Sequence, residues 1–122
     1  MRYVLMVEDD RWLADSYQRV LEKAGFKVVS VGGAEGAIRQ VETASPDVIL
    51  ADMLLEGNTV MGLLHELQSY DDTTQIPVII CTSLSHESLA VDRLHSYGVR
   101  AVLDKAVLTP EQLVATVKEA CP

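Results

Sequence analysis

Short apolar runs alternate along the chain with segments in which apolar residues recur at helical spacing. The runs lie at residues 3–7, 26–31, 47–51, 77–81 and 99–103. Their length is typical of β-strands, and the first, third and fourth are apolar almost throughout, as strands buried on both faces are. The second run alternates more between apolar and polar residues, which predicts an edge strand.

An amphipathic segment follows each run. The residues that share one helical face are Leu13, Tyr17, Val20, Leu21 and Ala24; Ala34, Ala37, Ile38 and Val41; Val60, Leu63, Leu64 and Leu67; Ala90, Leu94 and Tyr97; and Leu113, Val117 and Ala120. Gly25 and Gly98 stand where the first and fourth helices should end, and Thr109, Pro110 and Gln112 form a helix start. Strict alternation of five strands and five helices predicts an α/β fold, a parallel sheet with helices on both faces.

Length and composition narrow the class of protein. The chain has 122 residues, the size of one domain, with 48% hydrophobic and 23% charged residues. A net charge of -8 argues against a nucleic-acid partner, and no apolar stretch is long enough to predict a membrane span. Two cysteines and an N-terminus unlike a signal peptide predict a cytoplasmic protein with reduced thiols.

Polar residues follow four of the five runs. Glu8 and Asp9 follow the first, Asp52 the third, Thr82 the fourth and Lys105 the fifth. Because the carboxyl ends of parallel strands meet at one edge of the sheet, we expect these side chains to converge there.

These residue types favour phosphoryl chemistry. Crowded carboxylates repel one another unless a hard cation such as Mg²⁺ joins them, and Mg²⁺ also accepts phosphate oxygens. An Asp carboxylate can act as a nucleophile toward phosphorus. Lys105 can neutralise a phosphoryl oxygen, and the Thr82 hydroxyl can bond to another.

The segments VLMVEDD, PDVILADMLLEG, IPVIICTS and GVRAVLDK carry a resemblance to a known family. Over essentially its whole length, 1–122, the chain resembles the receiver domain of two-component response regulators. The resemblance implies a flavodoxin-like (βα)5 fold with strand order 2-1-3-4-5.

The resemblance also implies roles for individual residues. Asp52 is the expected phosphoacceptor and a ligand of Mg²⁺. Asp9 is the expected direct metal ligand, Glu8 is expected to reach the metal through water, and the backbone carbonyl of Leu54 is a further expected ligand. Thr82 is the expected switch hydroxyl.

A receiver is a signalling domain rather than an enzyme with a small substrate, since it catalyses only its own phosphorylation and dephosphorylation. Lys105 is its expected phosphate-binding lysine. The expected donor is a histidine kinase or a histidine phosphotransfer protein. The expected output is a downstream target protein, or a covalently linked output domain outside this chain.

The chain departs from the family pattern at several positions. Ala106 replaces the usual proline after Lys105, and because a non-proline cis bond costs about 3 kcal/mol, we expect a trans or a strained cis peptide and some shift of the lysine. Val102 replaces an aromatic ring, so any switch must use other side chains. Glu56 replaces a proline, and Val60 a frequent glycine, in the loop after the phosphoacceptor.

Other functions remain open from the residues alone. A phosphatase of the haloacid dehalogenase kind would need a second Asp where Leu54 stands. A flavin module would need a phosphate-cradling loop after the first run, where the acids lie. A phosphorylation-independent, atypical receiver acting as a protein-binding module is the main alternative.

Several polar or aromatic residues are better explained by structure than by chemistry. Asp10 is placed to cap the first helix, and Cys81 is predicted to be core. Trp12 could be a lid over the acids or a partly exposed aromatic on the first helix. Surface positions are expected for His65, His86 and His95, whose spacing does not suit a metal.

Overall fold

The structure is a computed structural model that describes residues 1–55, 58–83 and 91–122, with the backbone alone at 54–55, 58–59 and 91–93. Five parallel strands form a central sheet in the order β2-β1-β3-β6-β7. The strands are β1 (Tyr3–Val7), β2 (Lys27–Val31), β3 (Val48–Asp52), β6 (Val78–Thr82) and β7 (Val99–Asp104). The predicted α/β class and the order 2-1-3-4-5 are confirmed.

The burial of the strand residues agrees with this order. The residues of β6 are all buried, and so are four of the five in β1 and in β3, because helices cover both of their faces. The edge strand β2 has one buried residue, Val28, among more exposed neighbours. The predicted difference between central and edge strands is therefore confirmed.

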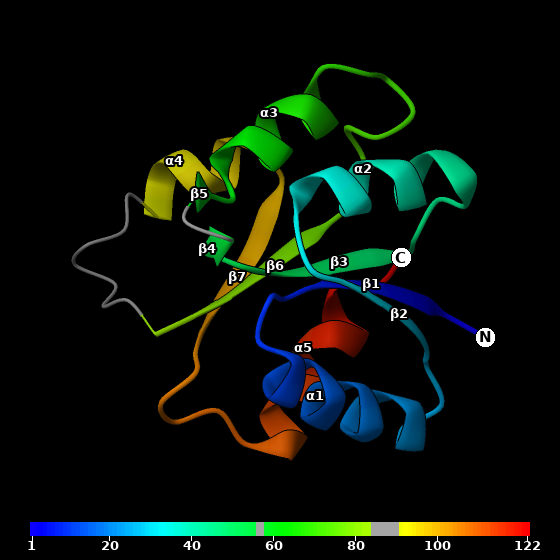
Figure 1. Ribbon diagram of the computed structural model, residues 1–122, viewed down its shortest axis with the longest axis vertical. Helices are drawn as coiled ribbons and strands as arrows, with labels where there is room; N and C mark the ends of the chain where they lie inside the picture. The colour runs from blue at the N-terminus through cyan, green and yellow to red at the C-terminus, as the bar shows by residue number, and fades with distance from the viewer. Residues whose placement is uncertain (56–57, 84–90) are drawn as a thin grey trace.

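Helices cover both faces of the sheet (Figure 1). The helices α2 (Ala34–Thr43), α3 (Met61–Gln68) and α4 (Val91–Ser96) lie on one face, and α1 (Arg11–Lys23) and α5 (Pro110–Ala120) lie on the other. Leu5 and Ile80 are in the α2–α4 core on the first face. Met6 and Ile79 are in the α1–α5 core on the second, because neighbouring residues of a strand point to opposite sides.

Side chains and glycines fix the helix ends as predicted. The Asp10 carboxylate accepts hydrogen bonds from the amides of Trp12 at 3.0 Å and Leu13 at 3.2 Å, so Asp10 is confirmed as the cap of α1. Gly25 and Gly98, at φ angles of 98° and 86°, follow α1 and α4 in the left-handed region that glycine adopts without strain.

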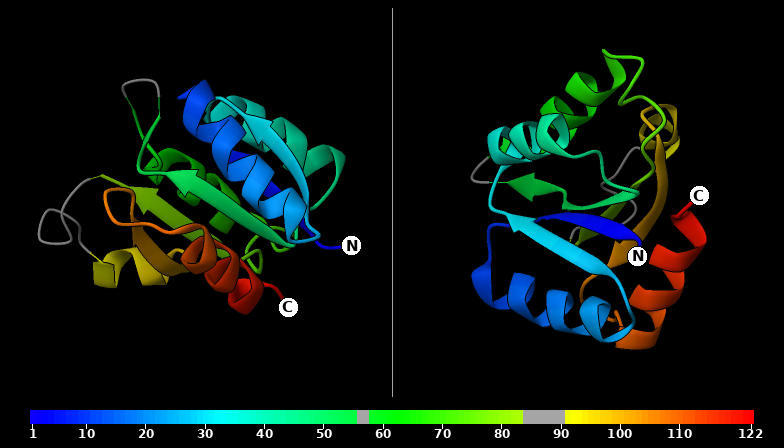
Figure 2. Two further views of the ribbon diagram at one scale, coloured as in Figure 1. Left: turned by 90° about the horizontal axis from the view of Figure 1, so that it is seen from below. Right: turned by 90° about the vertical axis from the view of Figure 1, so that its right-hand side faces the viewer.

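The sequence did not predict a small hairpin after β3. The strands β4 (Leu54–Leu55) and β5 (Asn58–Thr59) pair antiparallel between β3 and α3, and Figure 2 shows this green segment extending from the carboxyl end of β3. Trp12 is 84% exposed, so neither a lid nor a partly exposed packing role describes it. Within the described residues, no helix has the length and apolar character that crossing a membrane requires.

The cap of α5 gives a direct test of local stability. The Thr109 hydroxyl oxygen accepts a hydrogen bond from the Gln112 amide at 3.1 Å, and Pro110 occupies the first turn. Thr109→Ala should lower the free energy of unfolding by about 1 kcal/mol, because this amide loses its acceptor. Urea unfolding at constant m value measures the change. Thr109→Ser should stay near wild type, and an unaltered midpoint for the Ala variant would contradict the assignment.

Candidate functional site

Strand register brings the predicted site residues to one edge of the sheet. Val7 pairs with Ala51, so Glu8 and Asp9 follow β1 at the level of Asp52. Asp52 in turn pairs with Cys81 of β6. The polar residues therefore lie side by side because each directly ends, or directly follows, a buried strand.

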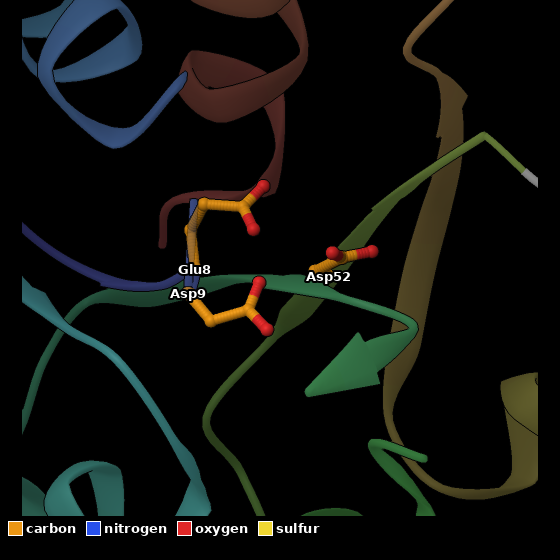
Figure 3. A group of neighbouring side chains, drawn as sticks. All are labelled: Glu8, Asp9 and Asp52. Atoms are coloured by element: carbon orange, nitrogen blue, oxygen red, sulfur yellow. The ribbon is translucent and has the colours of Figure 1, made fainter. Parts of the chain in front are cut away.

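Strand alternation places three of these side chains on the same face of the sheet. Glu8, Asp52 and Lys105 each lie two residues beyond a member of the α1–α5 core, namely Met6, Leu50 and Leu103. Figure 3 shows the three side chains as neighbours, with the carboxylates of Glu8 and Asp9 directed to the side on which Asp52 lies. The convergence expected from the sequence is therefore present for the three acids.

The distances within the site are short. One carboxylate oxygen from each of Glu8, Asp9 and Asp52 lies within 4.8 Å of the others. The Lys105 ammonium donates to Glu8 at 2.5 Å and lies 3.1 Å from an Asp52 carboxylate oxygen. Lys105 therefore bridges the two carboxylates, a contact to Glu8 that the sequence did not predict.

Burial controls the electrostatics of the bridge. Glu8 is only 4% exposed, and burial raises the pKa of its carboxyl more than the bond to Lys105 lowers it. Burial acts to lower the pKa of Lys105, but its hydrogen bonds to Glu8 and Asp52 raise that pKa above its ordinary value overall. The ammonium therefore stays protonated at neutral pH, where it offsets part of the carboxylate charge.

The donor set fits a hard divalent cation. Mg²⁺ binds oxygen ligands at about 2.0–2.1 Å in an octahedral arrangement, and ligand oxygens on such an ion are a few ångströms apart, as these three are. Three carboxylates and one ammonium, when all are ionised, leave a net charge of two negative units at the site. A cation would reduce the remaining repulsion between the acids.

Sequence comparison places the chain in a family. A family model described as the response regulator receiver domain matches residues 4–118. The chain belongs to the response regulator receiver family. A receiver domain accounts for the strand order and for the acidic pocket at the carboxyl ends of the strands together.

Individual relatives agree with this assignment. The phosphate regulon transcriptional regulatory protein PhoB of Escherichia coli is 31% identical over 117 residues, which are 96% of this chain and 50% of PhoB. The sensory transduction protein RegX3 of Mycolicibacterium smegmatis is 29% identical over 121 residues, or 97% of this chain and 50% of RegX3. The chain thus spans about half the length of the curated relatives it matches.

Solved structures with the same architecture include receivers. The signal receiver domain of a histidine kinase from Syntrophus aciditrophicus superposes with a TM-score of 0.85 at 28% identity, covering 98% of this chain and 89% of that one. The chemotaxis response regulator CheY4 of Vibrio cholerae gives a TM-score of 0.88 at 21% identity, with 98% of each chain covered. The CheY4 likeness bears on the fold alone.

Thr82, the expected switch residue of the receiver, lies on the other face of the sheet. It is 1% exposed and lies two residues beyond Ile80, a member of the α2–α4 core. Its backbone carbonyl accepts a hydrogen bond from the Lys105 amide at 2.9 Å. Val102, which pairs with Ile80, is half-buried against the same core, so an aliphatic side chain fills the position where the family has a ring.

The missing proline after Lys105 has a structural substitute. The Lys105–Ala106 peptide is trans, as the described residues include no cis peptide. The Ala106 amide donates to the Asp104 carboxylate at 2.9 Å, and the Val107 amide donates to the Asp104 carbonyl at 3.2 Å. A proline has no amide to donate. The hydrogen bond to Asp104 in this turn therefore requires a residue other than proline at position 106. The trans peptide still leaves the Lys105 ammonium 3.1 Å from Asp52.

The structure describes only part of the loop after Asp52. Glu56 lies outside the described residues. Leu54 opens β4 two residues after Asp52, and its carbonyl as a metal ligand stays a prediction. Val60 is fully buried in the α2–α4 core, which explains an apolar residue where the family often has glycine.

Sequence reasoning missed a buried layer beneath the acids. The Tyr17 hydroxyl of α1 lies 3.8 Å from the Cys81 sulfur, and Cys81 pairs in register with Asp52. Burial is the main cause that raises the pKa of the Tyr17 hydroxyl, and the neighbouring Cys81 raises it further. Burial likewise raises the pKa of Cys81 to about 11. The available signal was the position of Tyr17 on the apolar face of α1, which packs toward β6, the strand that contains Cys81.

Glu8 should make stability depend on pH. Because its pKa is raised in the folded protein, the folded state holds this proton more tightly than the unfolded state. The protonated Glu8 carboxyl therefore contributes fully to the free energy of unfolding below pH 4.5, the ordinary pKa of the group. This contribution is lost as the pH rises through the pKa of Glu8 in the folded protein. Without metal, wild type should lose stability relative to Glu8→Gln across this range, by about 1.4 kcal/mol for each tenfold difference in proton affinity between the two states.

Urea unfolding in a chelator between pH 4 and pH 8 measures this difference. Glu119→Gln, which removes an exposed carboxylate on α5, is the control and should show no such trend. A wild type that gains stability relative to Glu8→Gln as pH rises would contradict the assigned direction.

Cys81 should resist alkylation in the native state. At pH 8, a thiol with a pKa of about 11 is ionised in only about one molecule in a thousand, and it is also buried. Mass spectrometry after iodoacetamide treatment of a Cys121→Ser variant should therefore detect no adduct without denaturant and one adduct with it. Rapid labelling of this native variant would show that Cys81 is accessible.

Proposed function

We propose that this receiver accepts a phosphoryl group on Asp52 in a Mg²⁺-dependent reaction. The proposed donor is a phosphohistidine of a histidine kinase or of a histidine phosphotransfer protein. The observation that carries the proposal is the cluster of Glu8, Asp9 and Asp52 with the Lys105 ammonium 3.1 Å from Asp52. A carboxylate nucleophile, two further acids and a cation are the groups that this transfer uses.

In the proposed step an Asp52 carboxylate oxygen attacks phosphorus. The new O–P bond forms as the P–N bond to the histidine ring breaks, and the bonding electron pair goes to the ring nitrogen. Lys105 lies close enough to Asp52 to bond a phosphoryl oxygen once it releases Glu8. The Thr82 hydroxyl, from the other face of the strand end, is the second proposed donor to the phosphoryl group.

Glu8, Asp9 and Asp52, with the Leu54 carbonyl, would hold Mg²⁺. When bound, the ion neutralises negative charge on the carboxylates and on the phosphoryl oxygens. Asp9 is exposed and Glu8 is buried and bonded to Lys105. This difference supports Asp9 as the direct ligand and Glu8 as a residue that acts through water.

The proposed output lies outside the site itself. PhoB is named a transcriptional regulatory protein, and this chain spans half of its length. We propose that residues 1–122 form one cytoplasmic receiver domain without enzymatic turnover of a small substrate. Phosphorylation would change its contacts with a target protein or with a linked output domain, and neither nucleic acid nor membrane is a proposed partner.

Phosphorylation-independent protein binding is the second candidate function. Val102 favours it, since this position lacks the aromatic ring that couples to the switch hydroxyl in the family. The two candidates differ in one measurable respect, because only the first requires a reactive Asp52.

Incubation with acetyl phosphate and Mg²⁺ tests the proposal by mass spectrometry. Wild type should gain one phosphoryl group, Asp52→Asn should gain none, and Lys105→Met should react roughly 10²-fold more slowly because it lacks the cation. Asp10→Asn is the matched control: it removes a neighbouring acid, keeps a residue able to cap α1 and should react normally.

Metal binding can be followed separately. Trp12 is the only tryptophan and lies three residues after Asp9, so its fluorescence should respond to Mg²⁺. Modification of Asp52→Asn at the wild-type rate, or modification of wild type in a chelator, would contradict the proposal. Normal Mg²⁺ binding with no phosphoryl gain would favour the second candidate.

A further inference from the structure

A hollow of about 320 Å³ lies between the ends of α2 and α3 and the loop that follows α3. Figure 1 shows these two helices side by side on one face of the sheet, with the loop extending from the end of α3. Val41 and Leu67, both members of the α2–α4 core, form its apolar floor. Tyr70, which is 58% exposed, forms one wall.

Carboxylates surround this floor. Glu42 of α2, Glu66 of α3 and Asp72 of the loop line the hollow, and each is exposed. Within the described residues none of the three forms an ion pair, whereas Glu35 elsewhere on α2 bonds to Arg39 at 2.8 Å. No basic residue lies among those that line the hollow.

The backbone adds to the negative potential here. Both helices end at the hollow, and helix carboxyl ends carry partial negative charge. The last turn of α2 contains no basic residue to offset it, and that of α3 contains only His65. The hollow therefore combines an apolar floor, an aromatic wall and a rim of three carboxylates.

Hydrogen bonds hold the loop in place. The Thr73 hydroxyl donates to the Leu67 carbonyl at 2.5 Å, and the amides of Thr73 and Thr74 donate to the Tyr70 carbonyl at 3.2 and 3.0 Å. The Thr74 hydroxyl also bonds to Gln68 at 3.0 Å. Because the loop is already held by these bonds, it loses little conformational entropy when a ligand binds, which favours affinity.

We propose that this hollow is a docking site for a basic, amphipathic segment of a partner protein. The aliphatic stem of a Lys or Arg side chain fits the apolar floor while its charged end reaches the carboxylates, and a cation can also contact the Tyr70 ring. Charge complementarity selects this occupant, since an anionic ligand, or a second copy of this acidic chain, would be repelled.

The site is separate from the proposed phosphorylation site. The helices α2 and α3 run opposite to the strands, so their carboxyl ends lie at the sheet edge away from Asp52. Binding here therefore does not depend on the acidic pocket.

A synthetic helical peptide of Leu and Lys provides the test, with its Lys→Glu counterpart as the acidic control. We expect the basic peptide to bind wild type and to shift amide NMR signals around Val41, Leu67 and Tyr70. The triple variant Glu42→Gln, Glu66→Gln, Asp72→Asn should bind roughly tenfold more weakly. Tyr70→Ala should weaken binding by a similar factor through the lost wall.

General attraction between a basic peptide and an acidic protein is the rival explanation. The variant Glu22→Gln, Glu111→Gln, Glu119→Gln removes the same charge from α1 and α5, and it should bind the peptide within about twofold of wild type. Equal weakening by both triple variants, or NMR shifts confined to α1 and α5, would overturn the proposal. Concentration-dependent dimers that bury Tyr70 without peptide would overturn it as well, since a second copy would then fill the hollow.

Discussion

Crowding of negative charge at one sheet edge is the constraint on which the rest of the molecule depends. Three carboxylates from the ends of β1 and β3 lie within 4.8 Å of one another, and one of them, Glu8, is almost fully buried. Lys105 follows β7, which is two strands from β3 and three from β1, and its amide bonds to the Thr82 carbonyl of β6. The sheet order is thus what allows a single ammonium to offset two acids.

The two faces of the sheet carry different residues of the site. The side chains of Glu8, Asp52 and Lys105 belong to the face covered by α1 and α5, beneath which Tyr17 and Cys81 lie. Thr82 and Val102 belong to the face covered by α2, α3 and α4. The two sets of residues meet at the strand ends, where Cys81, which pairs with Asp52, directly precedes Thr82 in β6.

The sheet was predictable because its central strands are buried on both faces and leave continuous apolar runs. Site residues such as Glu8 and Asp52 were predictable because each directly follows or ends such a run. The β4–β5 hairpin was not, since strands of two residues are too short to show a period. The turn at Ala106 was not predictable either. The sequence shows that alanine replaces a proline, but it does not show that the Ala106 amide bonds to the Asp104 carboxylate.

The hydrogen bond from the Lys105 amide to the Thr82 carbonyl extends β6–β7 pairing past the last strand residue. It joins a cation directed to one side of the sheet with a hydroxyl residue directed to the other. Because the donor and the acceptor both belong to the main chain, the bond requires neither of the two side chains. The contact also needs no aromatic side chain, so the aliphatic Val102 leaves it in place.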